Sequence, residues 1–282
     1  MRFEKWQALG NDYLIVEADR LPWELTAARV RALCAGHTGV GADGVLELSH
    51  VAEPDHVAAL RIFNPDGSEA ELSGNGAREA VLYLRRCGWT DSDRFTIITR
   101  AGPVSPQITG PSTCRMQMGT ARLASAAYPS GPPDGRGTLE AAGRRWHFQH
   151  VSVGNPQCAI AVAGLRELRE LDLARLGPPI ERHELFPQRT NVSWFTAQDG
   201  AIRARIFERG TGETLASGTG ACGAAVAHVR NGGRSPVTVR LDGGDLEVEV
   251  GEDLGLALTG WALCVYGGEL SPELIKELDE TE

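Results

Sequence analysis

The length, composition and charge of this chain narrow the classes of protein to which it can belong. It has 282 residues, of which 42% are hydrophobic and 23% are charged, enough to form substantial cores and, at this length, two lobes. The formal net charge of −9 argues against nucleic acid or an anionic membrane as a partner. The first residues mix charged with apolar side chains and lack the apolar core of a signal peptide, so we expect a cytoplasmic protein.

Strand-like segments dominate the chain, and helices are few. In chain order the predicted strands are 2–9, 12–18, 56–63, 94–100, 147–153, 158–163, 192–197, 202–207, 236–241, 246–250 and 254–260. Helices are predicted at 26–36 and directly after residues 73 and 217. The stretch 123–143, rich in Pro, Gly and Ala, predicts a surface loop near a lobe boundary at residue 118. This pattern indicates an α+β fold.

One segment of the chain occurs twice. Residues 61–80 and 205–224 align without a gap at an offset of 144 residues and share nine of twenty positions. Each copy runs Arg-Ile-Phe, a glutamate, and then Ser-Gly-x-Gly-Ala, with the serines at Ser73 and Ser217. The offset is about half the chain, far longer than a solenoid period, and therefore predicts two similar lobes that face each other.

The repeated Ser-Gly-x-Gly-Ala predicts a ligand site at the start of a helix in each lobe. A run of good helix formers follows both copies, so each serine is a candidate N-cap. Unpaired N–H groups, the positive end of the helix dipole and glycines that allow close approach all favour an anion there. Two such sites would hold one small carboxylate from two sides. The simpler interpretation is that both serines only cap helices, which needs no ligand.

Other motifs point to neither a metal nor a nucleotide cofactor. The six cysteines are scattered without metal-type spacing, and His147 and His150, the only close histidine pair, fall on opposite faces of an alternating stretch. Gly218, Gly220 and Gly223 spell G-x-G-x-x-G, and Asp242 follows at a spacing suited to a ribose ligand. The surrounding sequence lacks the strand–helix alternation of a dinucleotide fold, so we do not favour that interpretation.

Ordered motifs over nearly the whole length resemble the diaminopimelate epimerase family. They are KWQALGNDYLIVE near the start, GVGADGVL at 39–46, the first repeat, VSVGNPQ at 151–157, TNVSW at 190–194, and ERGTGETLASGTGA in the second repeat. The resemblance implies two pseudo-symmetric lobes, each a mostly antiparallel β-sheet wrapped around a central helix. The last strand would return to the first lobe, which gives an N-terminal lobe of 1–117 plus 265–282 and a C-terminal lobe of 118–264.

The same resemblance implies an activity and a set of site residues. The activity is cofactor-independent epimerisation of LL-diaminopimelate to the meso form by two-base proton transfer, in lysine and peptidoglycan synthesis; a homodimer is compatible with the family. The backbone at Gly74, Asn75, Gly218 and Thr219 would cradle the reacting carboxylate. Asn64, Asn191 and Arg209 would hold the distal carboxylate, Glu208 the distal ammonium group, and Asn11 and Asn155 would complete the pocket. An arginine fork, amide donors and one carboxylate suit such a doubly zwitterionic substrate.

The catalytic positions depart from the family. Members of the family carry cysteine where this chain has Ser73 and Ser217, and histidine where it has Gln157. An alcohol is a weaker acid than a thiol by about seven pKa units, on the order of 10 kcal/mol, and one oxyanion donor supplies only about 3–4 kcal/mol. Three hypotheses therefore stay open: an epimerase with a paired-serine site, a form in which both cysteines were replaced to trap ligand, and a binding module. A racemase for another amino acid would require a changed distal pocket, which Asn64, Asn191, Glu208 and Arg209 do not indicate.

Overall fold

Two sets of strands and helices make up the structure, a computed structural model that describes residues 1–53 and 55–281. The first unit comprises Met1–Met116 and Gly260–Glu282, and the second comprises Gln117–Thr259. The sequence-based boundaries lie at 117/118 and 264/265. The difference has a simple cause: both crossings fall inside continuous strands, β9 (Thr113–Thr120) and β18 (Gly255–Trp261), so no turn signal marks them.

The first unit is a mixed sheet with three α-helices. The strands of this sheet are β1 (Arg2–Ala8), β2 (Asn11–Glu17), β3 (Val45–Ser49), β4 (Ala58–Phe63), β5 (Glu69–Ala70), β6 (Ile97–Thr99), β7 (Gly102–Val104) and β19 (Leu263–Glu269). Strand β8 (Gln107–Gly110) belongs to the same segment of the chain but pairs with β9 in the other sheet. The helices of the first unit are α1 (Ala27–Cys34), α2 (Gly74–Arg86) and α6 (Pro272–Asp279), with a 3-10 turn η1 (Ala18–Arg20). The strand order is β19-β1-β2-β3-β4-β6-β7, and only the β2–β3 and β4–β6 pairs are parallel.

The second unit repeats this arrangement. Its strands are β10 (Arg136–Ala141), β11 (Arg144–Ser152), β12 (Pro156–Ala161), β13 (Asn191–Gln198), β14 (Ala201–Glu208), β15 (Gly212–Thr214), β16 (Val237–Leu241) and β17 (Gly244–Val250), followed by β18. Its helices are α3 (Leu165–Glu170), α4 (Leu173–Glu181) and α5 (Gly218–Arg230). The strand order is β10-β11-β12-β13-β14-β16-β17-β18-β9-β8, and it again includes two parallel pairs, β12–β13 and β14–β16. The predicted α+β fold of two pseudo-symmetric, mostly antiparallel lobes is confirmed.

Part of the predicted loop at 123–143 is a strand. Residues 136–141 form β10, which pairs antiparallel with β11 from Arg136↔Gln149 to Ala141↔Arg144. Only Leu139 and Ala141 of this strand are buried. Two small or medium apolar side chains among Gly and Arg are too weak a period-2 signal to be distinguished from a turn-rich loop.

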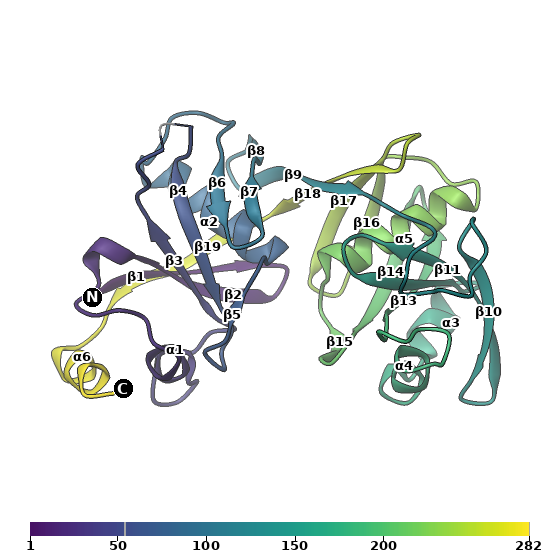
Figure 1. Cartoon of the computed structure of the whole chain (residues 1–282), viewed down its shortest axis with the longest axis horizontal. Helices are drawn as coiled ribbons and strands as arrows, with labels where there is room; N and C mark the ends of the chain where they lie inside the picture. Colours follow the sequence, from purple (N-terminus) through teal and green to yellow (C-terminus); the bar gives the residue numbers. More distant parts are fainter. Residues whose placement is uncertain (54, 282) are drawn as a thin grey trace. The chain divides into compact units, whose positions relative to one another are not determined.

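A central helix runs through each unit, as the repeat predicts. Helices α2 and α5 both have 13 residues, and a continuous run of each is buried, from Gly76 to Leu84 and from Gly220 to Ala227. Strands of the same unit surround each helix (Figure 1). Burial on all sides explains the many small residues of α5, because the sheet leaves room for little more than alanine and glycine around its axis.

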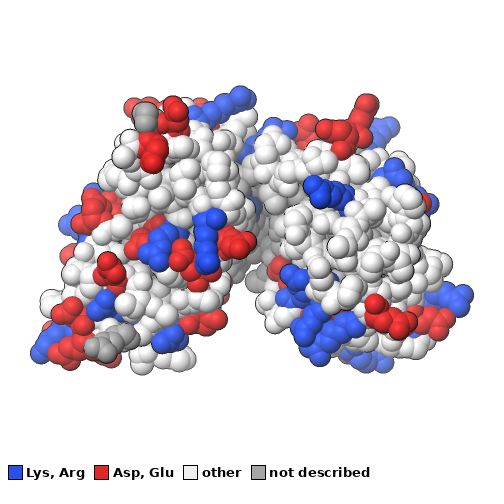
Figure 2. Space-filling model, viewed as in Figure 1, with Lys and Arg blue, Asp and Glu red and all other residues white. Residues whose placement is uncertain are grey.

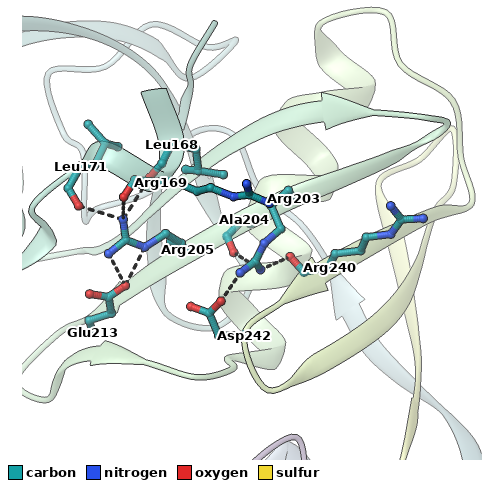
Figure 3. A network of polar contacts seen from close by, with 9 residues as sticks. All are labelled: Leu168, Arg169, Leu171, Arg203, Ala204, Arg205, Glu213, Arg240 and Asp242. Carbon is teal, nitrogen blue, oxygen red and sulfur yellow. Dashed lines mark hydrogen bonds and ion pairs between the residues drawn. The ribbon is translucent and has the colours of Figure 1, made fainter. Parts of the chain in front are cut away.

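An ion pair ties together the hairpin that precedes each central helix. Arg205 on β14 donates from Nε and Nη2 to one carboxylate oxygen of Glu213 on β15, both at 2.8 Å, and its Nη1 caps carbonyl groups of Leu168 and Leu171 (Figure 3). The equivalent Arg61 on β4 binds Glu69 on β5 with two bonds of 3.1 and 3.2 Å. These pairs are the Arg and Glu of the sequence repeat, and they hold the turn from which Ser-Gly-x-Gly-Ala starts.

Charged side chains are distributed over both units. On the face shown in Figure 2, acidic and basic side chains are interspersed over each unit. None of the helices in residues 1–53 and 55–281 combines the length and apolar character that a membrane span requires.

Gly220→Ala tests the close contact between the first turn of α5 and strand β14. A Cβ at Gly220 would lie 2.8 Å from Cδ1 of Ile206 and 3.2 Å from Cβ of Ser217, so we expect the free energy of unfolding to fall by about 1–3 kcal/mol. Gly218→Ala is the matched control, because its Cβ would come no closer than 3.6 Å to Leu258, and it should change stability by less than about 1 kcal/mol. Urea denaturation measures both; equal effects would contradict the tight contact.

Glu79→Gln tests a buried acid in α2. Glu79 is fully buried, and neither carboxyl oxygen has a hydrogen-bond partner among the described residues. Burial raises the pKa of this carboxyl well above 4.5, which Arg78 opposes and Asp12 and Asp43 reinforce. The folded protein then keeps a proton that the unfolded chain loses, so stability falls as pH rises above the unfolded pKa. Between about pH 5 and pH 8, urea denaturation should show a smaller loss of stability for Glu79→Gln than for the unmodified protein. If the free energy of unfolding falls equally with pH in both proteins, the effect is excluded.

Candidate functional site

Ser73 caps the central helix of the first unit. Its backbone is extended, and its Oγ accepts a hydrogen bond from the N–H of Gly76 at 3.1 Å. The phenol of Tyr13 on β2 donates a second hydrogen bond to the same oxygen at 3.2 Å. The hydroxyl therefore lies where the positive end of the helix dipole and two donors converge, an arrangement that stabilises negative charge on its oxygen.

A chain of amide groups lies beside Ser73. Asn75 donates from Nδ2 to Oδ1 of Asn11 at 3.2 Å, and Asn11 donates in turn to Asp43 at 3.0 Å. The guanidinium of Arg78 donates to Oδ1 of Asn75. The structure thus brings together Asn11, Asn75 and Ser73 around the first turn of α2. Gly74 is the first residue of that turn, where backbone N–H groups have no acceptor within the helix.

Ser217 has the equivalent place in the second unit but a different partner. It is buried, caps α5, and accepts a bond from the N–H of Gly220 at 3.3 Å. Its own hydroxyl donates to Oε2 of Glu208 at 3.0 Å, and the hydroxyl of Thr214 donates to the other carboxylate oxygen at 2.9 Å. A serine whose proton points at a carboxylate has a general base in place.

The second amide chain matches the first. Asn155 donates from Nδ2 to Oγ1 of Thr219 at 3.2 Å. The same two positions are joined in the first unit, where the direction is reversed and the helical residue Asn75 donates to Asn11. Gln157 is fully buried and donates to Oδ1 of Asn155 at 2.7 Å. Gly218 starts the helix directly after Ser217. The expected residues Asn155, Gly218 and Thr219 are therefore grouped with Ser217.

The residues expected at the distal carboxylate have polar partners of their own. Asn191 is buried at the start of β13 and accepts the backbone N–H of Arg209 through Oδ1 at 2.7 Å. The side chain of Arg209 is exposed and donates to the carbonyl of Gln188 at 2.8 Å. Asn64 bonds to the hydroxyl of Ser68 at 2.9 Å, in the turn between β4 and β5. Asn191 and Arg209 thus form one group, and Asn64 lies in the other unit.

Sequence reasoning missed two contacts. The sequence gives no role to Tyr13, which binds Ser73, and the family resemblance assigns Glu208 to the substrate, whereas in the structure its carboxylate accepts a hydrogen bond from Ser217. Neither contact has a counterpart in the other copy of the repeat, because the offset of 144 residues pairs Tyr13 with Gln157 and Glu208 with Asn64. Asp242, the ribose ligand of the nucleotide-binding alternative, forms an ion pair with Arg203 (Figure 3).

Known sequences match the chain over almost its full length. The family model described as diaminopimelate epimerase matches residues 3–124 and 149–263. A diaminopimelate epimerase of Azoarcus sp. (strain BH72) is 39% identical over 275 residues, which covers 96% of this chain and 98% of the relative. One of Synechococcus sp. (strain JA-3-3Ab) is 40% identical over 278 residues, covering 95% and 97%.

Solved structures share the fold at low sequence identity. A Bacillus anthracis phenazine biosynthesis protein of the PhzF family superposes with a TM-score of 0.67 at 18% identity, covering 96% of this chain and 99% of the other. A probable proline racemase from Agrobacterium radiobacter K84 gives a TM-score of 0.66 at 17% identity, covering 96% and 93%. At these identities the comparison supports the fold alone.

Proposed function

This chain belongs to the diaminopimelate epimerase family, and we propose that it converts LL-diaminopimelate to the meso form by inverting one α-carbon without a cofactor. The observation that carries this proposal is the pair of equivalent serines, each capping a buried helix and each hydrogen-bonded to a second ionisable side chain. Two-base inversion needs one group to remove the α-proton and another to deliver a proton. The repeated Ser-Gly-x-Gly-Ala provides two such groups.

Ser73 and Ser217 are the proton-transfer groups in this proposal, at the positions that the family resemblance gives to two cysteines. Replacing a thiol by an alcohol costs on the order of 10 kcal/mol in acidity. A placed general base contributes about 10²- to 10⁴-fold, or roughly 3–5 kcal/mol, and an oxyanion donor adds about 3–4 kcal/mol. The carboxylate of Glu208 on Ser217 and the N–H of Gly220 at the same oxygen are groups of these two kinds. Together they offset most of the difference.

The remaining residues recognise the two ends of the substrate. The free N–H groups at the first turns of α2 and α5, at Gly74 and Gly218, suit the carboxylate next to the reacting carbon. Asn75 and Thr219 follow in those turns. Asn75 is hydrogen-bonded to Asn11 at the start of β2, and Thr219 to Asn155 directly before β12.

The distal carboxylate is assigned to the exposed guanidinium of Arg209, with Asn191 and Asn64 as amide donors. We assign Glu208 to Ser217 rather than to the distal ammonium group, because both of its carboxylate oxygens already accept hydroxyl hydrogen bonds. A cytoplasmic location is part of the proposal. All six cysteines are thiols in the structure, as expected in a reducing compartment.

Exchange of the α-proton tests the proposed reaction directly. The protein and the double variant Ser73→Cys/Ser217→Cys are incubated with LL-diaminopimelate in D2O, and deuterium uptake and meso product are followed. We expect both to exchange, with the cysteine form faster because a thiol is the stronger acid. Turnover by the cysteine form alone would indicate a scaffold that lacks working bases. If neither form takes up deuterium or forms product, the protein is a binding module or acts on a different substrate.

Glu208→Gln tests the carboxylate on Ser217. The amide preserves the shape and can still accept the serine hydrogen bond, but it cannot take the proton, so kcat should fall by about 10²- to 10⁴-fold. The control Glu170→Gln removes a carboxylate that pairs with Arg166 on the exposed surface of α3, and its kcat should stay unchanged. Steady-state epimerisation assays measure both. A loss confined to KM would assign Glu208 to substrate binding instead.

A further inference from the structure

The two serines have equivalent places in the repeat but opposite hydrogen-bond environments. Ser217 donates its proton to the carboxylate of Glu208 at 3.0 Å. Ser73 instead receives a hydrogen bond from the phenol of Tyr13 at 3.2 Å, in addition to the N–H of Gly76. One hydroxyl therefore faces a base, and the other faces a proton donor.

Two pairs of equivalent positions carry this difference. At the repeat offset of 144 residues, Tyr13 corresponds to Gln157, and Asn64 corresponds to Glu208. Gln157 uses its amide on Asn155, and Asn64 uses its amide on Ser68, so neither reproduces the partner that its counterpart gives to a serine. The asymmetry therefore follows from which residues occupy these two pairs of equivalent positions.

The phenol of Tyr13 is held in place. The side chain is 5% exposed, and a Cβ at Gly44 would lie 2.6 Å from its Cε1, so the ring packs directly against that glycine. Burial raises the pKa of Tyr13 to about 12, although the hydrogen bond to Ser73 acts in the opposite direction. The group is consequently protonated at neutral pH, and its hydroxyl is a donor.

We propose that Tyr13 is a positioning residue that makes Ser73 the proton-delivering member of the pair, an inference that rests on the proposed function. As the O–H bond of Ser73 breaks, its proton forms the new C–H bond at the α-carbon. The electron pair stays on Ser73 Oγ, which takes the phenolic proton of Tyr13, and the negative charge moves to the phenol oxygen. A water molecule then returns a proton to the phenol, and the hydroxide that remains is neutralised by the α-proton that Ser217 and Glu208 remove and release to solvent. The transfer runs this way because a phenol is a stronger acid than an alcohol.

The test is a double-mutant cycle between Tyr13→Phe and Ser73→Cys. Phenylalanine keeps the ring against Gly44 and removes only the hydroxyl. In the protein with Ser73, Tyr13→Phe should lower kcat by about 100-fold and change KM by less than about threefold. In the Ser73→Cys variant the same change should cost less than about threefold, because a thiol gives up its proton without help from a phenol. A purely structural tyrosine would give equal losses in both backgrounds, and that result would overturn the proposal.

Tyr83→Phe is the matched control. Tyr83 is another buried phenol of the first unit, and it donates to Glu17 at 2.6 Å, so its loss reports the general cost of removing such a group. Its kcat should remain within about twofold of the unmodified protein. If Tyr13→Phe behaves like Tyr83→Phe while the unmodified protein turns over, the inference fails and the proposed function stands. If neither the serine form nor the cysteine form turns over, both fail.

Discussion

The rest of the structure depends on one constraint, the close contact between the first turn of the central helix and a strand of the sheet in each unit. Gly220 lies so near Ile206 of β14 that an added Cβ would be 2.8 Å away, and a Cβ added at Gly76 would be 3.0 Å from Leu46 of β3. The first turn of each helix is therefore fixed by packing against a strand. Because the N-cap side chain bonds to the same glycine, the place of each serine hydroxyl follows from that contact and not from a mobile loop.

A symmetric scaffold thus carries two different chemical environments. The features that position the serines occur twice: the capping bond, the asparagine that anchors the second helical residue, and the Arg–Glu pair of the preceding hairpin. The groups that touch the serine hydroxyls occur once each, Tyr13 in one unit and Glu208 in the other. Duplication supplies the geometry, and divergence at a few positions supplies the acid and base character of each half.

Much of this architecture could be predicted from the sequence, because the repeat combines several signals. Ser, Gly and a run of helix formers mark both central helices, and Arg-Ile-Phe marks the strands before them. The missed elements have weaker signals. Strand β10 has two buried side chains, and the crossings between units lie inside strands.

The partners of the serines could not be predicted, because they depend on register between distant segments. Tyr13 reaches Ser73 across 60 residues of chain, and no local pattern encodes that contact. Glu208 is only nine residues from Ser217, but its direction is set by the short β14–β15 hairpin, whose pairing of Glu208 with Gly212 returns the chain toward the helix. The sequence repeat therefore identifies the two serines, but it does not identify the side chains that bind their hydroxyl groups.

The pairing of the first strand with the last has a consequence for how the chain acquires its structure during synthesis. β1 lies between β2 and β19, so the first unit lacks one of its strands until the final residues are available. The second unit is a continuous segment, Gln117–Thr259, and contains all of its own contacts by the time β18 is made. The second unit therefore needs no later part of the chain to complete its sheet, whereas the first unit keeps an open sheet edge next to β1 until β19 is available.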